Sequence, residues 1–208
     1  MTAADNGLHM GASERGENGG NHDVYHMLYK SADEGDLETI NKVLNDNPDA
    51  LMACFPPSND RALHVAALAG HVKVVERLVM QMEREDLALR NDVDFTALHY
   101  AAGTGIKEMA ECMVEKNPDL VSLPGQGLLP VLFASLDGHK CMASYLYDQT
   151  PKAALSPVGG HAGATLLTSS IRTDAYELVW KLLEDHPDLV FARDGDAESA
   201  LMILARKP

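Results

Sequence analysis

Two histidines recur in the same local sequence and are the first candidates for chemistry. His64 lies in the hexapeptide Ala62–Ala67, and His99 lies in the matching hexapeptide Ala97–Ala102. An imidazole can act as a general acid or base, or bind a metal ion. The matching positions later in the chain lack histidine and carry Leu132, Thr168 and Met202. Because the position is not kept as histidine, we expect both imidazoles to hydrogen-bond backbone groups between neighbouring segments.

The cysteines and glycines give weaker signals. Cys112, His139 and Cys141 could be grouped as a zinc site, but their spacing does not match a closed site and a fourth ligand is missing. The segment Gly103–Gly105 is half of a dinucleotide fingerprint without a preceding strand. The sequence contains no phosphate-binding loop, nucleophile elbow or His-Glu-x-x-His motif. We therefore predict no catalytic residue, no metal site and no cofactor.

Composition narrows the possible functions further. The chain has 208 residues, with 31 acidic and 17 basic side chains and a net charge of −14 at pH 7. Nucleic-acid binding requires a basic surface, so we expect no nucleic-acid partner. Three cysteines without a C-x-x-C motif favour a reducing compartment, and we predict a cytoplasmic location. No segment approaches the roughly 18 apolar residues of a membrane span, so we expect no membrane insertion by this chain.

The histidine hexapeptides belong to a longer repeat that must position these residues. Its apolar signature position recurs at spacings of 35, 35, 33, 36 and 34 residues, at Leu28, Leu63, Leu98, Val131, Leu167 and Leu201. A turn residue follows each first helix, usually glycine, and a second apolar helix follows the turn. We expect His71 and His139, which come directly after turn glycines, to cap second helices. A period of this length predicts an all-α solenoid of paired antiparallel helices.

A proline motif follows three of the second helices. Asn47-Pro48-Asp49, Asn117-Pro118-Asp119 and His186-Pro187-Asp188 have the same spacing relative to the repeat. Proline cannot donate the next backbone hydrogen bond of a helix, so it marks the end of each second helix. The connection to the next repeat is therefore expected to begin at this proline.

The hexapeptides resemble the ankyrin-repeat signature, Thr-Pro-Leu-His-x-Ala, with small departures. Together with the Asn-Pro-Asp motif, Thr96–Gly105 and the closing Leu204–Pro208, residues 24–208 resemble the plant ankyrin-transmembrane family. Its members include the accelerated-cell-death and increased-tolerance-to-salt proteins. In that family a cytosolic ankyrin array precedes a C-terminal membrane domain named for a Pro-Gly-Gly motif, and that domain is absent from this chain. The resemblance implies a regulator of defence, cell death or salt and oxidative stress, on the cytosolic face of a membrane.

The chain divides into a tail and an array. Residues 1–22 hold five glycines and lack apolar periodicity, so we expect a disordered tail. The array covers 23–208, with repeats near 24–56, 57–91, 92–124, 125–160 and 161–194 and a partial repeat at 195–208. The last segment, Leu201–Ala205, is an apolar helix without a companion, and exposed apolar area costs about 25 cal/mol per Å². We expect the chain to be a fragment that self-associates through this uncapped end, or whose last helix frays.

In ankyrin arrays the loop tips and the exposed end of each first helix form the binding surface. Exposed apolar residues in one line often mark a partner site. For Phe95 and Leu128 the alternative is that the side chain folds back against the next turn. We predict a partner-binding site made of Asp60, Leu68, Phe95, Thr104, Leu128, Leu136, Asp137 and Arg172.

These observations predict a non-catalytic protein–protein interaction module that is not an enzyme. The partner is a protein whose identity is not encoded in any motif. Two alternatives remain open at this stage. The array could be a soluble substrate adaptor, for example one that recruits a ubiquitin ligase, or it could be the recognition part of a channel or enzyme.

Overall fold

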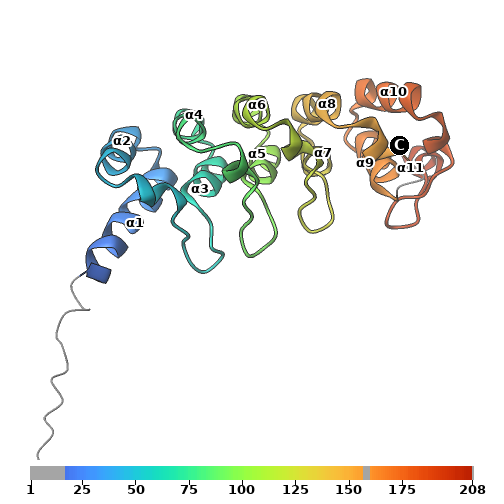
Figure 1. Cartoon of the computed structure of the whole chain (residues 1–208). Coiled ribbons are helices and arrows are strands. Elements are labelled where there is room, and N and C mark those ends of the chain that lie inside the picture. The colour runs from blue at the N-terminus through green and yellow to red at the C-terminus, as the bar shows by residue number, and fades with distance from the viewer. Residues whose placement is uncertain (1–16, 157–159, 208) are drawn as a thin grey trace, which may run out of the picture.

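The computed structural model describes residues 17–156 and 160–207, and within them the helices form five successive pairs followed by a single helix (Figure 1). No strand forms among these residues. The pairs are α1 (Glu17–Glu34) with α2 (Leu37–Asp46), α3 (Ala62–Ala69) with α4 (Val72–Gln81), α5 (Ala97–Thr104) with α6 (Lys107–Lys116), α7 (Pro130–Leu136) with α8 (Lys140–Gln149), and α9 (Ala162–Arg172) with α10 (Tyr176–Asp185), before the single α11 (Ala200–Arg206).

The helices stack as an extended array and not around one central core (Figure 1). The second helices, α2, α4, α6, α8 and α10, form one row, and the first helices form the adjacent row. Each first helix packs against its own second helix and against the first helix of the next repeat. The loops that join successive repeats extend away from the second helices. The predicted all-α solenoid is confirmed.

Left-handed turn residues reverse the chain inside each pair. Gly70 and Gly105 follow α3 and α5 with φ values of +80° and +73°, a conformation in which glycine carries no Cβ penalty. In the fifth pair Asp174 takes this role with φ +57°. Aspartate is among the few other residues that tolerate this region, which explains how the repeat continues without a glycine.

Short 3₁₀ helices follow the second helices, and three of them begin at the prolines of the predicted motif. They are η1 (Pro48–Met52), η3 (Pro118–Ser122) and η6 (Pro187–Val190), while η2 (Glu85–Ala88) and η4 (Lys152–Leu155) follow α4 and α8. The preceding helices end at Asp46, Lys116 and Asp185, two residues before each proline. The predicted helix ends at this motif are therefore confirmed.

The buried core runs along the whole array between the two rows of helices. The repeated apolar position is almost completely buried in the first five repeats and is exposed only at Leu201. Small residues dominate the first helices, and Ala66, Ala101 and Ala134 have no exposed surface. Because these side chains are small, neighbouring first helices can approach closely.

Helix α1 begins at Glu17, inside the segment predicted as a disordered tail that ends at residue 22. Adding residues to a helix that is already formed costs much less than nucleating one, and α1 is anchored by the buried Leu28 and Ala32. The composition of the segment did not reveal this extension. Residues 1–16 of the predicted tail lie outside the described residues. Among the described residues, no helix has both the length and the apolarity needed to cross a lipid bilayer.

Candidate interaction surface

The repeated histidines are buried parts of the array. His64 Nδ1 accepts a hydrogen bond from the backbone N–H of Arg61 at 3.3 Å, and His64 Nε2 lies 3.2 Å from the carbonyl oxygen of Phe95 in the next loop. Since a carbonyl can only accept, Nε2 carries the proton. The expected backbone bond between repeats is confirmed for His64.

His99 makes a different set of contacts. Its Nδ1 lies 3.2 Å from the backbone nitrogen and 2.9 Å from the hydroxyl of Thr96, its Nε2 is buried, and a backbone hydrogen bond with Leu128 of the next loop favours the protonated ring. Burial lowers the pKa of His99 to about 4, and it also lowers the pKa of His64. Both imidazoles are therefore neutral at pH 7 and shielded from substrates.

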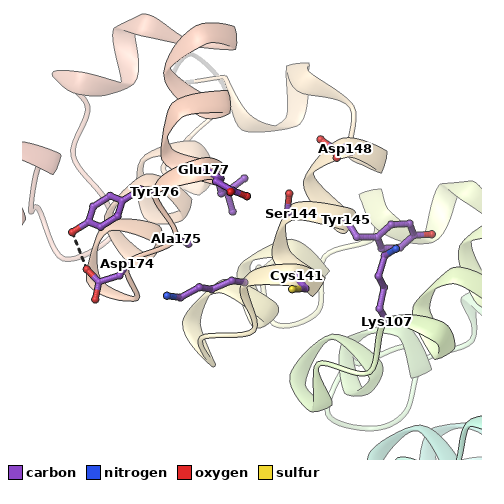
Figure 2. A pocket seen from close by; sticks show the side chains of 11 residues that line it. Lys107, Cys141, Ser144, Tyr145, Asp148, Asp174, Ala175, Tyr176 and Glu177 are labelled. Carbon is purple, nitrogen blue, oxygen red and sulfur yellow. Dashed lines mark hydrogen bonds between the residues drawn. The ribbon is translucent and has the colours of Figure 1, made fainter.

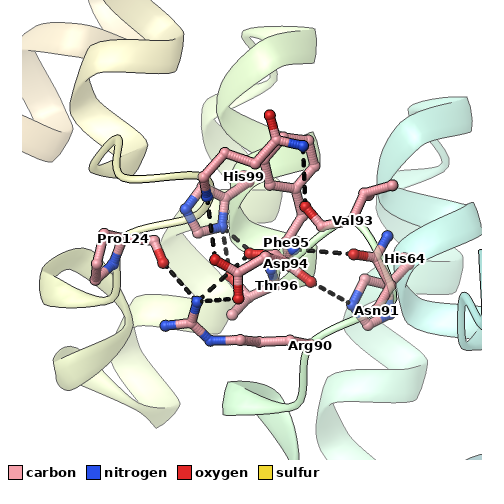
Figure 3. Close-up of polar contacts among 10 residues, drawn as sticks. His64, Arg90, Asn91, Val93, Asp94, Phe95, Thr96, His99 and Pro124 are labelled. Atoms are coloured by element: carbon pink, nitrogen blue, oxygen red, sulfur yellow. Dashed lines mark hydrogen bonds and ion pairs between the residues drawn. The ribbon is translucent and has the colours of Figure 1, made fainter.

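A polar network ties neighbouring loop tips together (Figure 3). The Arg90 guanidinium donates to the Asp94 carboxylate at 2.6 Å and to the Pro124 carbonyl of the following loop at 2.7 Å. The same carboxylate accepts from the backbone N–H of Gln126 at 3.2 Å. The hydrogen bond from Arg90 holds the pKa of Asp94 below its usual value. The loops therefore present one connected surface.

Asp60, predicted as a loop-tip contact, takes part in a similar network. Its carboxylate accepts hydrogen bonds from the Asn91 amide at 2.7 Å and from the Ser58 hydroxyl. Asn91 in turn donates to the Tyr100 hydroxyl at 2.9 Å. Asp60 is half-buried, and its carboxylate is engaged in hydrogen bonds to other residues of the array.

Phe95 and Leu128 also lie within the array and not at its exposed edge. The Phe95 ring stacks on His99 with centroids 5.4 Å apart and meets Phe133 edge-on at 5.1 Å. Leu128 is partly buried and packs against the core. Of the two arrangements considered for these side chains, the structure has the one in which they fold back. Neither presents a free side chain for a partner.

The ends of the first helices carry the exposed residues of the predicted set. Leu68 in α3 and Leu136 in α7 are 59% and 47% exposed, and Gly103 holds the same position in α5 between them. Arg172 holds it in α9 and pairs with Glu198. We call these four residues the first-helix row.

Two predicted residues flank this row. Asp137 is exposed, and its carboxylate oxygen would lie 3.3 Å from a Cβ atom placed on Gly103. No hydrogen bond or ion pair engages Asp137 among the described residues. Thr104 is half-buried, and its hydroxyl donates to the Ala101 carbonyl at 3.0 Å. Of the eight predicted residues, Leu68, Leu136 and Asp137 thus have exposed side chains that are free to contact a partner.

An open groove of about 850 Å³ lies on the other row, between α8 and α10 (Figure 2). Tyr176 and Tyr145 lie toward its two ends, with Cys141 and Ser144 between them. None of the eight predicted residues lines this groove, and the sequence carried no pattern that pointed to it. Burial raises the pKa of Tyr145 to about 12, so its phenol stays protonated at pH 7.

The cysteines do not act together as ligands in the described part of the chain. All three are free thiols, and Cys54 and Cys141 are exposed. Burial raises the pKa of Cys112 to about 11, which keeps it a thiol at neutral pH. No cluster of three or more His, Cys, Asp or Glu side chains is placed to hold a metal ion within residues 17–156 and 160–207.

Comparison with known proteins agrees with this geometry. A family model described as ankyrin repeats, in three copies, matches residues 27–123. The chain is 31% identical over 204 residues to the protein Accelerated Cell Death 6 of Arabidopsis thaliana, a match that covers 84% of this chain and 29% of that protein. It is 30% identical over 97 residues to human protein phosphatase 1 regulatory subunit 27, covering 47% of this chain and 61% of that protein. The chain thus spans less than two thirds of either relative.

Proposed function

Since the chain carries ankyrin repeats, we propose that it is a non-catalytic protein-interaction module whose partner binds along the first-helix row. One observation carries this proposal: Leu68 and Leu136 are exposed at the same helical position on either side of Gly103. Exposed apolar side chains in line on a rigid surface suit a protein ligand better than a small molecule. The recurrent histidines are neutral and buried, so they add no exposed imidazole to this row.

The spacing of the row favours an extended peptide as the ligand. Packed helix axes are about 8–10 Å apart, so Leu68 and Leu136, two repeats apart, are separated by roughly 16–20 Å. An extended peptide rises about 3.3 Å per residue, so two apolar anchors about six residues apart would reach both leucines. Gly103 lets the peptide backbone pass close to the helix between these anchors. A lysine or arginine of the ligand would pair with the free carboxylate of Asp137.

We further propose that the array is the cytosolic ankyrin part of a plant membrane-associated regulator of defence or stress signalling. The match to Accelerated Cell Death 6 over 84% of this chain supports this assignment. That protein is much longer than the chain, so its full activity is a property of the longer protein. A cytoplasmic location is part of the same proposal.

A second candidate function is recruitment of a protein phosphatase. The 30% identity to a protein phosphatase 1 regulatory subunit over 97 residues favours it. The two candidates differ in their partner and not in their use of the array. Binding of purified protein phosphatase 1 catalytic subunit to the chain, measured by calorimetry, would support the second candidate, and its absence would leave the first.

A displayed library of linear peptides, selected against the purified chain, tests the interaction surface. Selected peptides should carry two spaced apolar anchors and a basic residue, and their affinity should fall about tenfold or more in the Leu68→Asp and Leu136→Asp variants. Met80→Asp is the matched control, because Met80 is at least as exposed as the two leucines but lies on second helix α4. Equal losses in all three variants, or none, would contradict the proposed site.

A further inference from the structure

The residue before each second helix normally closes the seam between two repeats. His71, Ile106 and His139 occupy this position, and each lies at most 3.0 Å from a Cβ atom placed on the turn glycine of the preceding repeat. Before α10 the residue is Ala175, whose methyl group does not come within 4 Å of such an atom. The atom nearest to a Cβ placed on Gly138 belongs instead to Thr173, at 3.8 Å. The seam between α8 and α10 therefore lacks the side chain that fills the earlier ones.

Ring packing differs at this seam as well. Tyr145 of α8 faces α6, where the Lys107 ammonium lies 5.1 Å from its ring centroid. The same helix position in α10 holds Lys181, which places no ring in the next seam. Its ammonium instead spans the seam to both carboxylate oxygens of Asp148 at 2.8 Å and to the Ser144 hydroxyl at 3.3 Å. The groove of about 850 Å³ between α8 and α10, which we call the seam groove, follows from these replacements (Figure 2).

The floor of the seam groove is apolar. Ala175 and Leu178 line it and are only 7% and 2% exposed, so they lie at its base. The exposed Cys141 thiol and the Tyr145 ring line its α8 side (Figure 2). A few polar groups around an apolar base are typical of ligand sites. The floor therefore suits an apolar group of a ligand.

The charges around the seam groove balance. Of the five charged side chains that line it, Lys107, Asp148 and Asp174 already have ion-pair partners. The side chains of the other two, Lys140 and Glu177, make no hydrogen bond or ion pair among the described residues. They have opposite signs, so the groove holds no free net charge although the chain carries −14. A peptide group matches this pair with one carbonyl acceptor and one N–H donor, whereas a charged ligand would be repelled by one of the two.

We propose that the seam groove binds a neutral aromatic side chain of a partner protein, together with the backbone amide groups beside it. The ring rests on Ala175 and Leu178, and the amide groups pair with Lys140 and Glu177. An aromatic side chain buries about 150–250 Å² and is a common anchor at protein interfaces. The seam groove lies on the second-helix row, so this contact is separate from the first-helix row and does not rest on the function proposed for it.

Two thiols of the chain provide a direct test. Cys141 and Cys54 are both exposed, and of the two only Cys141 lines the seam groove. The probe is the tripeptide Gly-Trp-Gly with acetylated and amidated ends, and the readout is the rate of iodoacetamide alkylation at each cysteine, measured by mass spectrometry. The probe should slow alkylation of Cys141, with half the effect at about 1 mM, and should leave Cys54 unchanged. Capped Gly-Ala-Gly, Asp-Trp-Asp and Lys-Trp-Lys should each need about tenfold more.

Filling the seam groove should abolish this protection. Ala175→His introduces the imidazole that closes two earlier seams, and it should raise the half-effect concentration about tenfold or more. Ile106→His is the matched control, because it places the same side chain at the same helix position before α6, and it should bind as the wild type does. Ser144→Gln narrows the groove independently without adding charge, at a helix position where α4 and α6 carry Glu76 and Glu111, and should weaken binding similarly.

Several results would overturn the proposal. They are a wild type whose Cys141 stays unprotected at roughly 10 mM Gly-Trp-Gly, equal protection of Cys54, equal protection by Gly-Ala-Gly or by either charged tripeptide, and wild-type protection in both Ala175→His and Ser144→Gln. Leu68→Asp and Leu136→Asp should leave the protection of Cys141 unchanged. The seam groove and the first-helix row can therefore fail independently.

Discussion

The imidazole Nε2 of His139 lies 2.8 Å from the carbonyl oxygen of Gly103, one repeat earlier in the chain. His71 makes the same contact with the carbonyl oxygen of Asp33, also at 2.8 Å. Both residues occupy the N-cap positions of second helices, yet neither side chain caps its own helix. The expected capping role is therefore wrong for the side chains. These imidazoles instead satisfy a carbonyl group near the end of the first helix of the preceding repeat, and so join two repeats.

Replacing His139 by alanine should destabilise the array. The Gly103 carbonyl would lose its partner, and the expected loss is about 1 kcal/mol of unfolding free energy. Urea unfolding followed by circular dichroism would measure it. His26, which is exposed on α1, provides the control, and His26→Ala should leave the midpoint nearly unchanged. Similar midpoints for the two variants would show that the inter-repeat bond contributes little.

Gly125→Ala should destabilise the loop before α7. A Cβ atom at this position would lie 2.7 Å from the Phe95 ring, 2.8 Å from His99 Nε2 and 2.9 Å from the Asp94 carbonyl oxygen. Relieving such crowding is expected to cost about 1–3 kcal/mol. The matched variant Gly195→Ala has no neighbour within 4 Å of its new methyl group and should unfold as the wild type does. Chemical denaturation of both variants would decide the comparison.

Acidification should weaken the array before its carboxylates titrate. Burial lowers the pKa of His99 from 6.5 to about 4, so the unfolded chain binds more protons between these values. The contribution of His99 is complete above pH 6.5 and is lost as pH falls to about 4, by up to roughly 3 kcal/mol. His64 acts in the same direction. Urea midpoints measured from pH 7 to pH 4.5 would give the slope.

The His99→Gln variant separates this effect from other titrating groups. Glutamine stays neutral, so the variant should be less stable at pH 7 but should lose less stability on acidification. The carboxylates of Asp94 and Asp194, whose pKa values lie below the usual 3.8, act only below that pH. A variant with the same pH slope as the wild type would rule out His99 as the source.

Lys116 supports the end of the preceding second helix. Its ammonium group donates to the Val79 carbonyl at 2.7 Å and to the Met82 carbonyl, at the C-terminal end of α4. Lys116→Met keeps the apolar stem and removes the donors, and we expect a loss of about 1–2 kcal/mol. Lys30→Met removes an exposed lysine that, among the described residues, pairs with Glu34 alone at 3.7 Å, and should change stability little. Thermal unfolding would measure the melting temperatures of the two variants. Equal melting temperatures would contradict this expectation.

The fold was predictable because its information is local and periodic. Each repeat supplies its own apolar pattern and turn residue, and three repeats add a proline motif, so spacing predicts the pairs and the proline marks the ends of three second helices. Asp174 shows that the period survives the loss of one glycine, since the position needs only a residue that tolerates positive φ. The predicted boundary of the tail at residue 22 differs from the structure, because α1 extends toward the N-terminus beyond the buried residues that anchor it.

The sequence by itself determined the repeat, the all-α architecture, and the positions of Leu68 and Leu136 on equivalent turns. Only the tertiary structure decided which predicted side chains are free. The Asp60 carboxylate accepts a hydrogen bond from Asn91, 31 residues later in the chain. The Phe95 ring packs against His99 and against Phe133 of the next repeat. Periodicity fixes the direction of a side chain relative to its own helix, but not which neighbour covers it. That is settled by packing between repeats.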